Sequence, residues 1–253
     1  MSKRVFWAMF ALHATGCANI EGVYFTSGRD SADSTVNESE TDDSDRDGEG
    51  QGSAEPQDPD AADDRSRPEG QLGCRDVQLG RVVEGERAQL TGVTVSTPMG
   101  IRAPGFFVQD PGGGTWSGLW VYLDEADVTV ELGEVINVSG TVAEWHGLTE
   151  LIVTQPIEVL DTDTSRTVDA VTLTTIPADW EPYEGVVVRL EGVALSGAED
   201  DRGNAMTNWY IGIVDTFMDV SSVEGAYRHV TGVLTYSWGT YKLAPRTAAD
   251  FQR

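Results

Sequence analysis

The sequence is poor in cysteine, histidine and lysine. Its 253 residues include two cysteines and three histidines, too few for a disulfide scaffold or a four-cysteine zinc site. Acidic residues outnumber basic residues by 42 to 17, which gives a formal charge of −25. Such a surface repels phosphate backbones and lipid headgroups at long range. The GxSxG and HExxH patterns are absent as well, so we expect no catalysis by this chain and no cofactor.

The first residues are typical of an export signal. Lys3 and Arg4 precede an apolar run at 5–12 that is too short to span a bilayer as a mature helix. The motif Ala-Thr-Gly-Cys follows at 14–17. This motif resembles the lipobox of bacterial lipoproteins, in which a dedicated peptidase cleaves before the cysteine and the thiol is acylated.

The lipobox resemblance implies a signal peptide at 1–16, a lipidated N-terminus at 17–27 and acylation of Cys17. It places the protein in the bacterial cell envelope, bound to the outer membrane or the periplasmic face. Ala14 departs from the pattern, because a leucine is usual three residues before the cysteine. The alternative is an ordinary secretory signal, with Cys17 incidental or paired with Cys74.

Residues 28–70 are predicted to be a disordered acidic tether. They contain 15 acidic and 4 basic residues and almost no apolar side chains, so burial cannot offset the entropy of ordering them. Asp43, Asp45 and Asp47 match the first half of a calcium-binding loop, but the twelfth position is Ala54 and no helical pattern flanks it. We interpret the segment as a solvated linker.

The rest of the chain repeats itself. Leu-Thr-Gly-Val-Thr-Val-Ser at 90–96 recurs as Leu-Glu-Gly-Val-Ala-Leu-Ser at 190–196, and the pattern of valines and glycines at 138–151 recurs at identical spacing at 230–243. Conserved internal spacing indicates two copies of one unit. We therefore expect two domains, at 71–165 and 166–253.

Short, alternating strand patterns run through both copies. In the first they lie at 90–96, 105–111, 118–122, 138–142 and 147–151, and in the second Trp209–Ile213 is predicted to supply the second strand. Gly140 and Gly232 are expected where a barrel must bend or bulge. The connection at about 161–182 is polar and carries two prolines, which favours a linker or capping segment over a strand. The predicted fold is all-β, with two tandem five-stranded barrels of the OB type after the tether.

The same patterns resemble a known class of module. Several segments resemble OB-fold modules found beside the catalytic domain of secreted nucleases of the endonuclease/exonuclease/phosphatase superfamily. They are Arg75–Gly80 leading into Leu90–Ser96, Gly105–Pro111, Gly118–Tyr122, the segment with Gly140 and Gly147, Glu181–Arg189 and Tyr236–Arg246. The resemblance covers nearly all of 72–253 and implies the fold. It does not extend to that superfamily's catalytic domain, whose metal-binding carboxylates, Asn and two His have no counterpart here.

The candidate ligand-binding residues are aromatic, because OB folds bind on the face of strands two and three and through the flanking loops. They are Trp120, Tyr122, Trp145, His146, Tyr210, Tyr236, Trp238 and Tyr241. Stacking on a sugar ring or a nucleobase is one role for them, and contacts in the core or between barrels are the other. His229 is predicted to be a structural or surface histidine.

The charge of residues 71–253 helps to choose between the candidate classes of ligand. Residues 71–253 carry 26 acidic and 11 basic residues, with a single lysine, Lys242, which disfavours phosphate backbones. We therefore expect an envelope-anchored binding module for a glycan or a protein partner. A nucleic-acid-binding accessory to a separate secreted nuclease and a structural envelope spacer are the alternatives.

Overall fold

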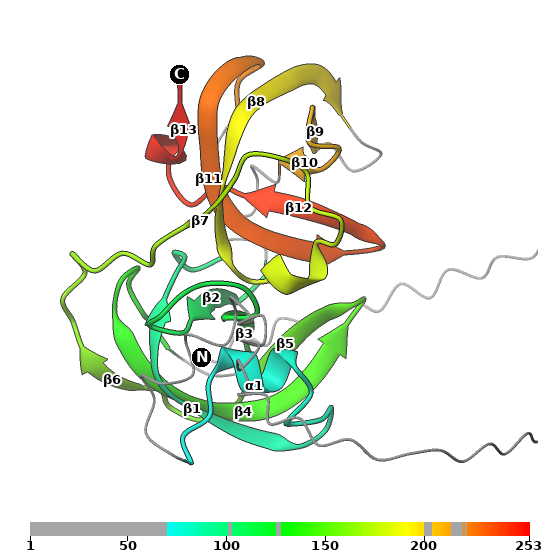
Figure 1. Cartoon of the computed structure of the whole chain (residues 1–253). Coiled ribbons are helices and arrows are strands. Elements are labelled where there is room, and N and C mark those ends of the chain that lie inside the picture. Colours follow the sequence, from blue (N-terminus) through cyan, green and yellow to red (C-terminus); the bar gives the residue numbers. More distant parts are fainter. Residues whose placement is uncertain (1–69, 101–102, 125–127, 200–203, 214–219, 221) are drawn as a thin grey trace, which may run out of the picture. The chain divides into compact units, whose positions relative to one another are not determined.

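The computed structural model of the chain is mostly β and contains two sheets (Figure 1). The residues it describes belong to one compact unit, Ala54–Arg253, and are 70–100, 103–124, 128–199, 204–213, 220 and 222–253. The expected signal peptide, Cys17, the tether and the calcium candidates Asp43, Asp45 and Asp47 lie outside the described residues. Within those residues no helix is both long enough and apolar enough to cross a membrane.

The first sheet is a ring of strands that follows a short helix. The elements are α1 (Cys74–Gln78), β1 (Arg87–Val95), β2 (Gly105–Gln109), β3 (Gly118–Leu123), β4 (Val135–Trp145), β5 (Leu148–Val153) and β6 (Glu158–Asp161). The strand order β1-β2-β3-β5-β4 returns to β1 through a β1–β4 pairing, and β6 is added beside β4. The β3–β5 pair is parallel.

This ring is less regular than the predicted barrel. β1 pairs with β2 at only two positions, Thr94↔Gln109 and Val95↔Val108. The register between β1 and β4 also shifts between Leu90 and Val93, at a bulge that contains Gly92 with a φ of 67°. The bulge and the short seam leave the first sheet as a ring of strands and not a proper barrel.

The second sheet closes into a five-stranded barrel, as predicted. Its elements are β7 (Val171–Leu173), η3 (Glu181–Tyr183), β8 (Val187–Glu199), β9 (Ala205–Thr207), β10 (Gly212–Ile213), β11 (Gly225–Ser237), β12 (Thr240–Ala244), η4 (Ala248–Asp250) and β13 (Phe251–Gln252). The order β8-β9-β10-β12-β11 returns to β8, with β10 and β12 parallel. The long strands β8 and β11, yellow and orange in Figure 1, run side by side.

Two sequence predictions about this half are wrong. Trp209–Ile213 is not one strand, because Trp209 and Tyr210 lie in the turn between β9 and β10. Their backbone nevertheless buries Trp209, Ile211 and Ile213 together in the core, as the alternation indicated. The connection at 161–182 does contain a strand, β7, which pairs in parallel with β8 because Val171 and Leu173 alternate with polar residues.

Alternation gives strands β2 and β3 two apolar faces. Phe106 and Val108 join Leu119 and Val121 in the core of the first ring. Phe107 and Trp120 point to the opposite face, where they pack with residues of the second barrel, including Val187, Val220 and Val233. The face that an OB fold commonly offers to ligands is therefore covered in the first ring.

The mid-strand glycines are explained by close backbone approach. A Cβ added to Gly140 would lie 2.4 Å from the Ile152 carbonyl oxygen, and one added to Gly232 would lie 2.7 Å from the Ala244 carbonyl oxygen. Neither residue has a left-handed φ. The expected bulge lies instead at Gly92, in the first strand.

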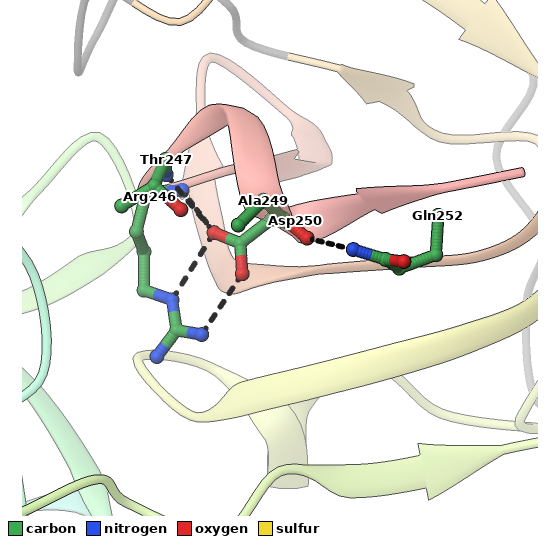
Figure 2. A network of polar contacts seen from close by, with 5 residues as sticks. All are labelled: Arg246, Thr247, Ala249, Asp250 and Gln252. Atoms are coloured by element: carbon green, nitrogen blue, oxygen red, sulfur yellow. Dashed lines mark hydrogen bonds and ion pairs between the residues drawn. The ribbon is translucent and has the colours of Figure 1, made fainter.

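A buried carboxylate fixes the end of the second barrel. Asp250 accepts hydrogen bonds from the backbone N–H groups of Arg246 (2.7 Å) and Thr247 (3.0 Å), and it pairs with the Arg246 guanidinium at 3.0 Å (Figure 2). Gln252 donates to the Ala249 carbonyl oxygen at 2.6 Å. These contacts hold β13 against β11.

Candidate functional site

Two tight hairpin turns build the candidate site. The turn between β4 and β5 consists of His146 and Gly147, flanked by the pair Trp145↔Leu148. The turn between β11 and β12 consists of Trp238 and Gly239, flanked by the pair Ser237↔Thr240. These turns occupy equivalent positions in the sequence repeat, because Gly147 corresponds to Gly239.

Both turns have a positive φ at each central residue. The angles are 52° and 85° at His146 and Gly147, and 58° and 85° at Trp238 and Gly239. This is the pattern of a type I′ turn, which matches the twist of a hairpin and favours Asn or Gly at its first central position. A bulky residue there costs on the order of 1 kcal/mol. Both turns nevertheless carry a ring at this position, His146 in one and Trp238 in the other.

The rings of the two turns meet. His146 stacks on Trp238 with a centroid separation of 3.8 Å and an interplanar angle of 23°. Trp145 contacts the edge of His146 at 4.7 Å and 75°. Trp145 and Trp238 remain 60% and 58% exposed. We call Trp145, His146 and Trp238 the aromatic cluster.

Two tyrosines support the cluster from β11 and β12. Tyr236 and Tyr241 pack at a centroid distance of 4.7 Å, and the Tyr236 ring lies so close to Gly147 that an added Cβ would meet its Cε1 atom at 2.5 Å. The Tyr241 hydroxyl donates a hydrogen bond to Glu181. Burial, followed by this bond to Glu181, raises the pKa of Tyr241.

Three carboxyl groups lie on or contact β4 and β5, the strands of the hairpin that carries Trp145 and His146. Glu144 accepts a hydrogen bond from the Thr149 hydroxyl at 2.6 Å. Burial raises the pKa of Glu150 to about 7, and the charge of Glu144 adds to the effect. Glu184 is 1% exposed, and burial raises its pKa to about 8, partly opposed by a hydrogen bond from the Thr149 backbone.

The other predicted ligand-binding residues lie elsewhere. Trp120 is only 3% exposed and packs on Phe107 at 4.8 Å, so its ring is closed to a ligand. Tyr122 is half-buried against the same cluster of apolar residues. Tyr210 is 80% exposed on the β9–β10 turn, and none of the ring contacts between described residues joins it to the aromatic cluster. The structure thus brings together five of the eight predicted residues.

His229 and Cys74 have structural surroundings. His229 is buried in β11, where desolvation and the neighbouring Arg189 lower its pKa, in agreement with a structural role. Cys74 is buried in the core of the first ring, with its Sγ atom 3.9 Å from the Val108 carbonyl oxygen. Across the described ranges no group of three or more His, Cys, Asp or Glu residues has a geometry that could hold a metal ion.

Sequence reasoning missed the polar residues at the contact between the two sheets, above all Glu184 and Gln78. Nothing in the local pattern at Glu184 distinguishes it from the solvated acidic residues around it. Its burial depends on packing between segments far apart in the chain. Comparisons with protein families, with curated proteins and with solved structures found no match.

Proposed function

We propose that this chain is a lipid-anchored binding module of the bacterial cell envelope and that it binds a glycan. Its two OB-like modules form one unit, and the aromatic cluster is the binding site. The observation that carries the proposal is the exposure of Trp145 and Trp238 on two turns whose backbone is strained. Surface tryptophans held in fixed positions are typical of recognition sites.

Aromatic rings suit a sugar ligand for a chemical reason. One face of a pyranose ring presents C–H groups that pack on an indole, while its hydroxyls need polar partners at the rim. Glu144 and Thr149 are polar side chains of the same hairpin as Trp145. The negative charge of residues 71–253 repels a phosphate backbone and is neutral toward an uncharged sugar.

The proposal is tested by titrating the full chain with neutral oligosaccharides and with single-stranded DNA, followed by tryptophan fluorescence. We expect saturable binding of an oligosaccharide. Trp145→Ala and Trp238→Ala should each weaken it about tenfold or more, which corresponds to about 1.4 kcal/mol. Tyr210→Ala is the matched control, because it removes an exposed aromatic residue outside the cluster, and should leave the affinity unchanged.

Other outcomes select the other functions. Binding of DNA that weakens with salt would favour the nucleic-acid accessory function that the resemblance to nuclease-associated modules suggests. Absence of binding to either ligand, with both tryptophan variants folded, would contradict the proposal and leave a protein partner or a spacer role.

A further inference from the structure

The two sheets meet at a junction of buried polar groups. The Glu184 carboxyl, just before β8, accepts a hydrogen bond from the Thr149 N–H of β5 at 3.0 Å. Gln109 of β2 accepts one from the Val187 N–H at 3.0 Å. Gly185 lies against the backbone of Gly118. A Cβ added to Gly118 would be 2.1 Å from the Gly185 carbonyl carbon. The backbones of the two sheets therefore approach each other closely next to Glu184.

Two acceptor atoms in this junction have no hydrogen-bond partner in the described part of the chain. They are Glu184 Oε2 and Gln78 Oε1, and both are buried. The Gln78 amide is oriented by its other end, since Nε2 donates to the Gly118 carbonyl oxygen at 2.9 Å. The Gln78 side chain also lies within hydrogen-bonding reach of the Glu184 carboxyl. A charged carboxylate with an unpaired oxygen is costly to bury, and a proton on Glu184 removes that charge.

The charges around Glu184 favour the protonated form of its carboxyl group. The groups that act on it are Glu181 of η3 and Glu144 of β4, both acidic, and the Tyr241 hydroxyl of β12, which already donates to Glu181. From α1 it faces the neutral Gln78, and from β5 it faces the Thr149 N–H. Burial is the largest cause of the raised pKa, about 8. The charges of Glu181 and Glu144 add to it, whereas hydrogen bonds with the Thr149 backbone and the Gln78 side chain oppose it.

The junction is linked to the aromatic cluster by short paths. Thr149 lies on β5 two residues after Gly147, the turn residue that packs on Tyr236. Glu181 holds Tyr241, and Tyr241 packs on Tyr236. Because His146 comes from one sheet and Trp238 from the other, their stack persists only while the junction keeps the two sheets in register.

We propose that Glu184 is protonated in the folded chain, and that the uncharged carboxyl keeps the two sheets in the arrangement that assembles the aromatic cluster. Alkaline pH removes this proton, places a charge in the junction and loosens the cluster. The effect on ligand binding rests on the proposed function, whereas the effect on the junction does not.

The sign of the pH effect follows from the raised pKa. The ordinary value is 4.5 and the folded value is about 8, so the folded state holds a proton that the unfolded state has lost. The stabilisation is complete below about 4.5 and falls as pH rises to about 8. For the full chain we expect the Tm to fall by about 5 °C or more between pH ~5.5 and ~9.

The test compares the full chain with Glu184→Gln, whose uncharged amide mimics the protonated carboxyl and can still accept the hydrogen bond from Thr149. Glu184→Gln should flatten the dependence of Tm on pH and keep the near-ultraviolet circular dichroism of the aromatic residues constant up to pH ~9. The unmodified chain should lose part of that signal. Glu150→Gln is the matched control, since it removes the other carboxyl with a raised pKa.

Infrared spectroscopy gives a readout that does not depend on stability. Because Glu150 is also protonated at pH ~6, the measurement uses the Glu150→Gln variant. That variant should show the carbonyl band of a protonated buried carboxyl at pH ~6, and the band should disappear by pH ~9.5 and be missing when Glu184→Gln is added. If no such band exists, or if Glu150→Gln alone flattens the pH dependence, the proposal is wrong. If glycan binding is absent while the band and the Tm behave as expected, the proposed function is wrong, but the protonation of Glu184 in the folded chain is supported.

Discussion

Among the described residues, those that adopt a left-handed backbone without being glycine are Trp116, His146, Tyr210 and Trp238. Every one carries an aromatic ring, although Asn, Asp and Gly adopt this conformation at lower cost. His146 and Trp238 exploit the conformation to aim rings at each other from separate hairpins. The strained backbone at His146 and Trp238, together with the stack that it allows, supports the proposed binding role of these two residues.

The two turn glycines provide a prediction at the scale of the residue. Gly147 and Gly239 share a φ of 85°, but a Cβ at Gly147 would meet the Tyr236 ring at 2.5 Å, whereas at Gly239 nothing lies within 4 Å. We expect Gly239→Ala to lower the free energy of unfolding by about 1 kcal/mol through backbone strain. Gly147→Ala should lower it by about 1–3 kcal/mol more.

Urea unfolding of both variants measures this difference, because each variant serves as the control of the other. Equal losses would mean that the Tyr236 ring moves aside freely and does not hold the turn.

At the scale of the element, the sequence predicts strands better than it predicts their partners. The strand patterns at 105–111 and 118–122 correspond to β2 and β3, and their alternation correctly separates Phe106 from Phe107. The alternation does not reveal what covers the second face, since both faces are apolar. The pattern is therefore compatible with Trp120 in a binding face, whereas packing against the second barrel buries it.

The internal repeat predicts more of the structure than any single strand pattern does. Equal spacing of Gly147 and Gly239 from their strands predicts equivalent hairpins, and the structure has them. The meeting of these hairpins is not predictable from spacing, because it depends on how the two sheets pack against each other. For the same reason Glu184, which no local pattern distinguishes, was not among the predicted residues.

The close approach of Gly118 to Gly185 provides a prediction about how the elements β3 and β8 are joined. An added Cβ at Gly118 would lie 2.1 Å from the Gly185 carbonyl carbon, so the backbones must separate. We expect Gly118→Ala to lower the free energy of unfolding by about 3 kcal/mol or more.

Gly197→Ala is the matched control for this prediction. It lies on β8, and its added Cβ would meet only the end of the Glu224 side chain, at 3.1 Å. Denaturant unfolding should show a change of less than about 0.5 kcal/mol for it. A similar small change for Gly118→Ala would show that the two sheets are not packed as tightly as described.

At the scale of the whole molecule, charge predicts how salt acts on binding. The chain has a formal charge of −25, but stacking of an uncharged sugar on Trp145 and Trp238 releases no counterions. We expect the Kd for a neutral oligosaccharide to change less than about twofold between ~50 mM and ~300 mM salt. Isothermal titration calorimetry in both buffers measures it, and a loss of affinity of tenfold or more would indicate an ionic ligand.

The stack of His146 on Trp238 joins two residues that hold the same place in the two copies of the repeat. A single copy of the unit could make such a contact only with a second molecule, turn against turn. The rest of the contact is not symmetric, because Phe107 and Trp120 of the first copy pack on Val187 and Val233 of β8 and β11, which correspond to β1 and β4. Two copies in one chain can also differ at equivalent positions, so one turn carries an imidazole and its counterpart an indole, an asymmetry that no homodimer of identical chains can encode.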